Sequence, residues 1–413
     1  MNEDYYKRKD CRQCHSQDLS IAINLKPTPL ANDYIYEKDL KINKKKYPLD
    51  VYFCNSCKHL QLLDVVNPKK LFENYVYVSG TSSEFVKHFE KYAEYLNHNF
   101  NSEGLVIDIG SNDGTILKAF KKFGYQVLGV EPAKAIAEEA IKNGIDTIIE
   151  FFNPALASEI SKKYGEVNII TANNVFAHID NPSDFLAGVR KIISSDNGVF
   201  CFEVSYLKDV MENTFFDTIY HEHLDYHSLL SLRGFLKRNG FEIIDALKVA
   251  THGGSIRVIS QKIGGKYKIS ESVNKLISEE YNTGLHELST FIHFTNQIEK
   301  TRGNLIKVLK DLKAQGKSIV GYGAPAKATT LMHHFDIGPE EIDYIVDDSK
   351  WKQNLYTPGK KIKILPVNNM YEDNPDYILI LAWNFADFII KKNRKFHDNG
   401  GKFIIPLPKV KII

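Results

Sequence analysis

Residues 104–132 read GLVIDIGSNDGTILKAFKKFGYQVLGVEP. A short apolar run leads into a glycine-rich turn, which is followed by a helical stretch and a second apolar run. This order is typical of the first unit of a doubly wound α/β domain, in which the turn between strand and helix faces a ligand. The stretch therefore predicts the α/β fold class, with a Rossmann-like sheet.

The turn DIGSNDG (108–114) differs from the G-x-G-x-x-G turn that binds dinucleotides. Asp108 ends the strand, Gly110 makes the turn, Asn112 lies within it, and Gly114 opens the helix without a close phosphate contact. S-adenosylmethionine (SAM) carries an amino acid where NAD carries phosphates, so the turn favours SAM. Glu131 ends the second strand and can accept hydrogen bonds from both ribose hydroxyls. NAD and a fold without cofactor are the alternatives.

A later strand and loop, NIITANNVFAHID (168–180), belong to the same sheet. We expect Asn174 and Phe176 to flank the methionine end of the cofactor. The alternative is that Asn173 and Asn174 only cap a loop.

The rest of the chain predicts three domains. Helical spacing marks 82–99, further strands are expected at 198–205, 240–249 and 253–262, and 270–315 reads as two helices broken near 282–284. A second α/β unit follows. The predicted domains are a small zinc-binding domain at 1–72, a class I SAM-dependent methyltransferase domain at 73–263, and a helical linker with a C-terminal Rossmann-like domain at 264–413.

Four of the five cysteines form two C-x-x-C pairs, Cys11 with Cys14 and Cys54 with Cys57. A two-residue spacer lets two thiolates bind one ion at tetrahedral angles, and two such turns complete a four-thiolate site. We predict a structural Zn²⁺ with no open coordination position. Four buried free cysteines are the alternative.

The net charge of +2 is too balanced for a protein that mainly binds nucleic acid. The start, MNEDYYKRKD, does not read as a signal peptide, and no apolar run approaches the 18 or so residues of a membrane span. We therefore expect a cytoplasmic protein without a nucleic-acid or membrane partner. The oligomeric state is left open.

A second glycine-rich turn contains Gly321 and Gly323, followed by Ala326, with Asp347 and Asp348 further on. Three interpretations apply: a tight turn in a nucleotide-free domain, a surface for the nucleotide end of a substrate, or a second redox cofactor. Lys327, directly after this turn, is a candidate phosphate partner.

The segment TIYHEHLDYHS (218–228) concentrates titratable side chains. A metal site and a solvated loop are alternatives, but general acid–base chemistry fits best. Methylation at carbon requires removal of a C–H proton beside a carbonyl, a base with pKa near neutrality, and donors for the enolate oxygen. Neutral histidine suits the role of the base, and tyrosine hydroxyls suit the role of donors to the enolate oxygen.

The sequence resembles the sugar C-methyltransferases, which place a methyl branch on C3 of nucleotide-linked 4-keto-6-deoxy sugars. The resemblance spans about residues 10–360 and rests on the two C-x-x-C pairs and these motifs, in order: YVYVSGTS (75–82), DIGSNDG, GVEPA, NVFAHID, FEVSYL, FDTIYHEHLDYHS, THGGSIRV, GYGAPAKATT and VDDSKWKQNLYTPG. It implies a SAM-binding middle domain, a C-terminal domain without its own cofactor, and a nucleotide-diphospho keto-sugar bound between them. The product would be a branched deoxysugar of a surface glycan or secondary metabolite.

The resemblance also implies roles for single residues. The base falls on His223, with Tyr220 and Glu222 as its neighbours in the active site. His178 and Tyr77 line the same pocket, with Tyr75 as the alternative tyrosine. His178 as a loop histidine and Tyr77 as a core residue are the plain alternatives.

Four residues are expected to contact the substrate. They are His221, which can instead support the loop from behind, together with His252, Gly253 and Lys327. The backbone N–H groups of 253–255 can face the substrate or simply open a strand. Because base and donor must converge on one sugar, we expect a turn or short helix near 220–224 that places Tyr220 and His223 on one side.

Three rival functions remain at this stage. A sugar O- or N-methyltransferase on the same scaffold would need no 4-keto group. An RNA methyltransferase with a zinc module is opposed by the balanced charge. A nucleotide-sugar binding protein without catalysis is opposed by the intact cofactor turn.

Overall fold

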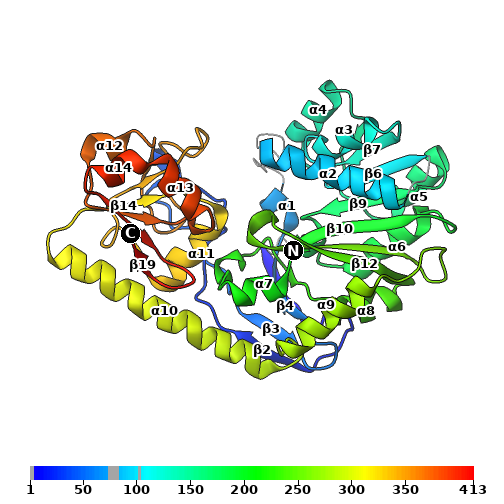
Figure 1. The fold of residues 1–413 in the computed structure, drawn as a ribbon, viewed down its shortest axis with the longest axis horizontal. Helices are drawn as coiled ribbons and strands as arrows, with labels where there is room; N and C mark the ends of the chain where they lie inside the picture. Colours follow the sequence, from blue (N-terminus) through cyan, green and yellow to red (C-terminus); the bar gives the residue numbers. More distant parts are fainter. Residues whose placement is uncertain (1–3, 73–82, 101–103) are drawn as a thin grey trace.

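The computed structural model describes residues 4–72, 83–100 and 104–413 and confirms the predicted fold class. In Figure 1 the methyltransferase-like domain and the C-terminal domain lie on opposite sides of the molecule. The N-terminal strands lie between them at its base, beside the long helix α10 (Leu288–Ala314).

The middle domain is built on a seven-stranded sheet with the order β8-β7-β6-β9-β10-β13-β12. Strand β13 is antiparallel to both of its neighbours, and the other described pairings are parallel. The strand order reverses between β6 and β9, which is where open α/β sheets bind ligands. The strands are β6 (Leu105–Ile109), β7 (Gln126–Val130), β8 (Thr147–Ile148), β9 (Ile169–Asn173), β10 (Val199–Ser205), β12 (Phe241–Val249) and β13 (Ser255–Lys262).

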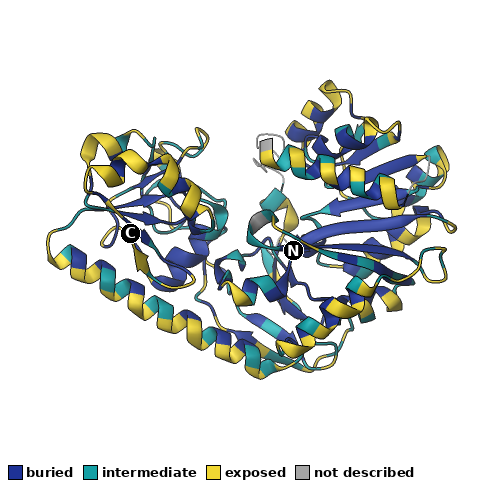
Figure 2. Cartoon of the chain, viewed as in Figure 1, coloured by how far each residue is buried: buried dark blue, intermediate teal, exposed yellow. Residues whose placement is uncertain are grey.

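Helices cover both faces of this sheet, so its strands are apolar on both sides. Ile107 on one face and Val106 on the other belong to separate buried clusters. Figure 2 shows the strands as buried and the outer helix surfaces as exposed. The helices are α2 (Ser83–Asn99), α3 (Thr115–Lys121), α4 (Lys134–Lys142), α5 (Pro154–Tyr164), α6 (Pro182–Ile192) and α8 (Leu229–Arg238). Helix α7 (Leu207–Glu212) follows β10 and buries Leu207 in a separate apolar cluster with residues of the N-terminal and C-terminal domains.

The N-terminal domain has a four-stranded antiparallel sheet to which the middle domain contributes one strand. Strand β11 (Asp225–Tyr226), from the histidine-rich segment, pairs with β4 (Leu60–Leu62). The remaining elements are β1 (Tyr5–Lys7), β2 (Leu19–Ile23), β3 (Val51–Cys54), β5 (Asp64–Val66) and α1 (Pro68–Phe72). The histidine-rich segment is therefore held by two domains at once.

The C-terminal domain is a six-stranded sheet with the order β16-β15-β14-β17-β18-β19. It follows α9 (Glu271–Asn282) and α10, and the predicted break between these helices is confirmed, with Gly284 at φ 74°. The other elements are β14 (Ile319–Tyr322), α11 (Ala326–Phe335), β15 (Ile345–Val346), β16 (Ile364–Leu365), α12 (Asn369–Asp373), β17 (Tyr377–Ile380), α13 (Ala386–Lys392), α14 (Arg394–Asp398), β18 (Lys402–Ile405) and β19 (Lys411–Ile412).

The N-terminal and C-terminal domains share one apolar core. The ring of Phe53 on β3 lies 5.5 Å from that of Phe291 on α10, and both residues are buried. Among the described residues, no helix is both long enough and apolar enough to cross a bilayer.

Candidate active site

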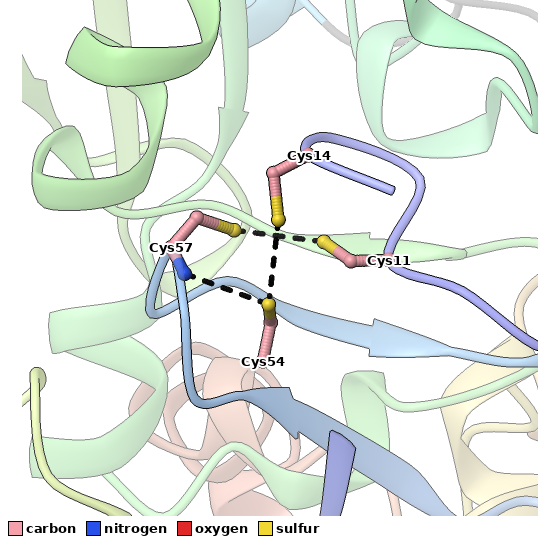
Figure 3. A group of neighbouring side chains, drawn as sticks. All are labelled: Cys11, Cys14, Cys54 and Cys57. Carbon is pink, nitrogen blue, oxygen red and sulfur yellow. Dashed lines mark hydrogen bonds between the residues drawn. The ribbon is translucent and has the colours of Figure 1, made fainter. Parts of the chain in front are cut away.

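The four paired cysteines converge at one point, as Figure 3 shows. Sulfur atoms of Cys11 and Cys57, and of Cys14 and Cys54, lie 3.5 Å apart, and all four lie within 4.8 Å of one another. A tetrahedral Zn²⁺ with Zn–S bonds of about 2.3 Å needs sulfur separations of about 3.8 Å. The cluster therefore fits one zinc ion held by four thiolates, with no ligand position left for a substrate.

Each cysteine pair sits in a tight turn that ends in a left-handed residue. His15 N–H donates to the Cys11 carbonyl, and Lys58 N–H donates to the Cys54 carbonyl, both at 2.8 Å. His15 and Lys58 have φ of 59° and 66°. These turns bring two sulfur atoms to one side of the chain, which is the geometry that the C-x-x-C spacing predicts.

The turn at residues 108–114, here called the cofactor turn, depends on its two glycines. Gly110 has φ 72°, and a Cβ there would lie 2.3 Å from the Cγ2 atom of Val175. Gly114 has φ 75° and caps α3, as predicted. Asn112 between them also has a positive φ, 50°. The backbone therefore folds tightly at the carboxyl end of β6 and packs directly against the 174–178 loop.

Glu131 is tied to this turn by its carboxylate. One oxygen accepts the N–H of Asn112 at 2.9 Å, and the other accepts the N–H of Ala133 at 2.8 Å. Burial raises the pKa of Glu131. Asp108 accepts the Thr171 hydroxyl at 2.6 Å, and burial raises its pKa to about 7. Both acids thus shape the turn itself, while the Glu131 carboxylate keeps lone pairs that can accept further hydrogen bonds.

Replacing Glu131 with glutamine is expected to raise the Kd for SAM about 10–100-fold, because hydrogen bonds to a charged group contribute about 1.5–3 kcal/mol. Isothermal titration calorimetry measures this directly. Glu139→Gln, at an exposed position on α4, is the matched control and should leave the Kd unchanged. A Kd for Glu131→Gln within twofold of the wild type would contradict the assignment.

The 174–178 loop joins the cofactor turn to the histidines. Asn174 has φ 54°, and its N–H donates to the Glu203 carbonyl at 2.8 Å. Phe176 is not brought to the cofactor turn: its side chain is fully buried, 4.7 Å from the Phe202 ring and stacked on His227. A side chain without accessible surface supports the loop from beneath, and a contact between Phe176 and the cofactor stays a prediction.

The predicted turn near 220–224 is confirmed. His223 N–H donates to the Tyr220 carbonyl at 2.8 Å, and the two rings lie 4.2 Å apart. His223 Nδ1 lies 2.7 Å from the Thr218 carbonyl, which can only accept, so Nδ1 carries the proton in the neutral ring. Nε2 then holds the basic lone pair.

His178 lies beside His223, with ring centres 5.1 Å apart. Burial lowers the pKa of His178 to about 4, so its ring is neutral at physiological pH. Its Nδ1 is buried and has no hydrogen-bond partner among the described residues. The structure therefore brings together three of the predicted catalytic residues: Tyr220, His223 and His178.

Glu222 and His221 point toward the N-terminal domain. Glu222 Oε1 accepts the Asn32 amide at 2.8 Å, and burial raises the pKa of Glu222 to about 7. His221 is 1% exposed, and its Nε2 donates to the Pro48 carbonyl at 3.0 Å. This placement favours the alternative in which His221 supports the loop from behind.

Stability between pH 4 and 6.5 is expected to depend on His221. Burial lowers its folded pKa to about 4 from an ordinary 6.5. Below pH 6.5 the unfolded chain takes up a proton that the folded chain refuses, so the free energy of unfolding falls as the pH drops through this window. The loss from this group approaches about 3 kcal/mol.

Urea unfolding at a series of pH values measures this dependence. His221→Gln should reduce the slope between pH 4 and 6.5 by the share of one histidine, because other buried histidines such as His178 keep theirs, while His98→Gln, at an exposed position on α2, should leave the slope unchanged. An unchanged slope in His221→Gln would contradict the expectation.

A second group of side chains joins the histidine segment to the C-terminal domain. Lys327 Nζ lies 3.8 Å from Asp217 Oδ2 and 4.6 Å from the centre of the Trp383 ring, and burial lowers its pKa. Trp383 Nε1 donates to Asp217 Oδ2 at 2.6 Å. The Trp383 ring stacks on the Phe215 ring, with ring centres 4.6 Å apart. A Cβ on Gly253 would lie 2.5 Å from Phe215, and Lys327 Nζ lies 5.5 Å from the centre of the same ring, so these two predicted substrate residues both lie against Phe215.

Sequence reasoning did not single out Phe215, Asp217 and Trp383. Asp217 lies inside the motif FDTIYHEHLDYHS, and Trp383 follows strand β17. Their pairing joins positions 166 residues apart, and no local pattern indicates it.

The second glycine-rich turn is closed by its own surroundings. The Asp347 carboxylate accepts the N–H of Ala324 at 2.6 Å and that of Ser349 at 2.7 Å. The Ala324 carbonyl accepts the Tyr34 hydroxyl at 2.6 Å and Lys352 Nζ at 2.9 Å. The Asp347 carboxylate is already bound by two backbone donors, and Tyr34 of the N-terminal domain occupies the Ala324 carbonyl. These contacts favour the interpretation as a tight turn in a nucleotide-free domain.

Three predicted positions lie outside what the structure describes. Tyr77 and Tyr75 fall within 73–82, and the side chain of His252 is not described. Their roles stay predictions.

Family models match the chain in three consecutive parts. Residues 11–72 match a putative zinc binding domain, 84–246 a methyltransferase domain, and 250–408 a C-methyltransferase C-terminal domain. The last match begins before β13, which the structure places in the seven-stranded sheet. The four-cysteine cluster thus lies in the part that matches a putative zinc binding domain, and the 108–114 turn lies in the part that matches a methyltransferase domain.

Relatives cover nearly the whole chain or less than half of it. The C-methyltransferase NovU of Streptomyces niveus is 33% identical over 406 residues, 98% of this chain and 96% of the relative. The magnesium protoporphyrin IX methyltransferase ChlM from Synechocystis PCC 6803, solved with SAM, has a TM-score of 0.33 and 14% identity, and covers 43% of this chain and 79% of that one.

A SAM-dependent methyltransferase from Clostridium acetobutylicum ATCC 824 has a TM-score of 0.36 and 13% identity, and covers 43% of this chain and 92% of that one. The near-complete alignment with NovU and the three consecutive domain matches decide the assignment. The chain belongs to the family of SAM-dependent C-methyltransferases that carry a zinc-binding N-terminal domain and a dedicated C-terminal domain.

Proposed function

We propose that this methyltransferase acts at C3 of a nucleotide-linked 4-keto-6-deoxy sugar, and that His223 is the base. The observation that carries the proposal is the hydrogen bond from His223 Nδ1 to the Thr218 carbonyl. It holds the ring in the tautomer whose Nε2 can accept a proton, and it strengthens that nitrogen as a base.

The proton at C3 passes to His223 Nε2, and its electron pair moves into an enolate whose negative charge lies on the 4-keto oxygen. Donors for that oxygen are the Tyr220 hydroxyl and the ring of His178. His178 is neutral because its pKa is lowered to about 4, and a neutral imidazole keeps one N–H to donate. SAM, when bound, supplies the methyl group that C3 attacks and leaves as S-adenosylhomocysteine.

Glu222 is suited to a sugar hydroxyl. Its pKa is raised to about 7 by burial, so near neutral pH it is protonated part of the time and can donate as well as accept. Asn32 fixes one carboxylate oxygen at 2.8 Å, which orients the other.

The nucleotide end of the substrate is assigned to the junction of the middle and C-terminal domains. Lys327 is the phosphate partner, and the N–H groups near Gly253 are further donors. Lys327 lies on α11 and Gly253 follows β12, yet both lie against the Phe215 ring, and Lys327 also lies over Trp383, which supports one shared substrate surface.

The test is to incubate the protein in deuterated water with SAM and a panel of 4-keto-6-deoxy sugar nucleotides. Mass spectrometry should detect a gain of one methyl group, and deuterium at C3 when SAM is replaced by S-adenosylhomocysteine. Methylation on oxygen or nitrogen, without exchange at C3, would replace the proposal with the O- or N-methyltransferase alternative.

A further inference from the structure

The side chain of Arg12 leaves the zinc cluster and reaches the catalytic loops. Arg12 lies between the ligands Cys11 and Cys14, and only 1% of its surface is exposed. We propose that Arg12 is a positioning residue that clamps the two loops carrying His178 and His223. The inference rests on the proposed function for the catalytic role of those histidines, but not for the clamp itself.

On one side, the guanidinium holds the segment that follows His223. Nη1 donates to the Leu224 carbonyl at 3.0 Å and lies 3.5 Å from Asp225 Oδ1. The same Leu224 carbonyl accepts the N–H of Leu62 at 2.9 Å, so this point is fixed to both the cluster and β4.

On the other side, the guanidinium faces the loop that carries His178. Nη2 lies 3.5 Å from Asp180 Oδ1, two residues beyond His178, and Arg8 Nη1 donates to the same oxygen at 3.1 Å. The two loops also bond to each other, because Leu224 N–H donates to the Ala177 carbonyl at 2.8 Å. One side chain thus spans the pair of loops at the point where their histidines meet.

The guanidinium is itself held in place. Gln61 Oε1 accepts the backbone N–H of Arg12 at 3.0 Å and its Nη1 at 3.2 Å. His59 Nε2 lies 2.5 Å from Asp225 Oδ1. Burial alone would raise the pKa of Asp225, but Arg12 and His59 together lower it below its ordinary value. Asp225 is therefore an anion opposite a buried cation.

Buried ion pairs of this kind add little net stability, but they select one geometry when several are possible. A planar guanidinium can direct two nitrogens to two loops, whereas a lysine ammonium is a single point charge. Charge alone should therefore not restore the function of the clamp.

The test compares Arg12→Met and Arg12→Lys with a matched arginine. Arg238 also joins the middle domain to the cluster, through Nη2 to the Gln13 carbonyl at 3.4 Å, but among the described residues no hydrogen bond or ion pair joins it to the catalytic loops. Arg238→Met is the control. The full-length zinc-loaded protein is used throughout.

Four quantities are measured: zinc content, the Kd for SAM, and the kcat and KM for deuterium exchange at C3. A displacement of about 1 Å can reduce rates about 10²-fold. We expect Arg12→Met to keep its zinc and its Kd for SAM within twofold, and to lose about 10–100-fold in kcat. Arg12→Lys should regain only part of this, and Arg238→Met should match the wild type.

NMR of ¹⁵N-labelled histidine gives a readout without turnover. The Nδ1–H signal of His223, identified by its loss in His223→Gln, should shift or broaden in Arg12→Met and persist in Arg238→Met. If the wild type does not exchange C3 but this signal still changes, the clamp stands and the proposed function fails.

A double-mutant cycle tests the route. Asp180→Asn and Arg12→Met should be non-additive in kcat, because each removes one partner of the same contact. An unchanged His223 signal, additive effects, or a kcat within twofold of the wild type would overturn the clamp. Loss of zinc and of SAM binding together in both Arg12 variants would also overturn it, in favour of a general folding role.

Discussion

Replacing His223 with glutamine is expected to lower turnover by about 10²–10⁴, the range typical of a positioned general base. The amide of glutamine can still donate to the Thr218 carbonyl, so the turn should persist. A glutamine amide is not a base near neutral pH, so it cannot take the C3 proton. The Kd for SAM should stay within twofold, because the cofactor turn lies on a different loop.

The measurement is single-turnover methyl transfer alongside calorimetric binding of SAM. His98→Gln, exposed on α2, is the control for the substitution itself and should be fully active. A His223→Gln variant that exchanges and methylates at the wild-type rate would remove the base from this position.

Replacing Cys54 with serine is expected to abolish activity through loss of the zinc ion. Structural zinc sites contribute about 10–16 kcal/mol of apparent binding free energy, which is available only to the folded domain. The strand that pairs with β11 runs directly from this cluster, and Arg12 and His59 bind Asp225 from beside it. Without the ion, the histidine segment loses its support.

Atomic absorption, calorimetric unfolding and SAM binding together check this expectation. Cys54→Ser should hold less than one equivalent of zinc and unfold at a lower temperature, yet retain SAM binding in the seven-stranded sheet. Cys201→Ser is the control, since Cys201 is buried against the Tyr92 hydroxyl and lies outside the cluster. Full activity of zinc-free Cys54→Ser would contradict a supporting role for the metal.

Local patterns predicted the parts of this molecule that local physics determines. The D-x-G-x-x-x-G turn, the two C-x-x-C turns and the helix break at Gly284 each depend on a few consecutive residues, and the structure has all of them. The turn from Tyr220 to His223 was predicted because two side chains on opposite faces of a strand cannot meet on one substrate.

Contacts between distant segments were not predictable in the same way. The bond from Arg12 to the Leu224 carbonyl spans 212 positions, and no periodicity marks either residue. Phe176 shows the converse: it lies in a motif that suggests a ligand, but its ring fills the core beneath the loop. Whether an aromatic residue of such a loop faces inward depends on the neighbouring helix, which a single sequence does not indicate.

The strand that the middle domain lends to the N-terminal sheet has a consequence for protein engineering. Residues 225–226 complete a sheet whose other strands end by residue 62. A chimera that takes its first 72 residues from one parent and its methyltransferase core from another would join mismatched surfaces directly behind the reaction centre. To exchange substrate specificity between relatives, residues 218–228 should therefore be transferred together with the N-terminal domain.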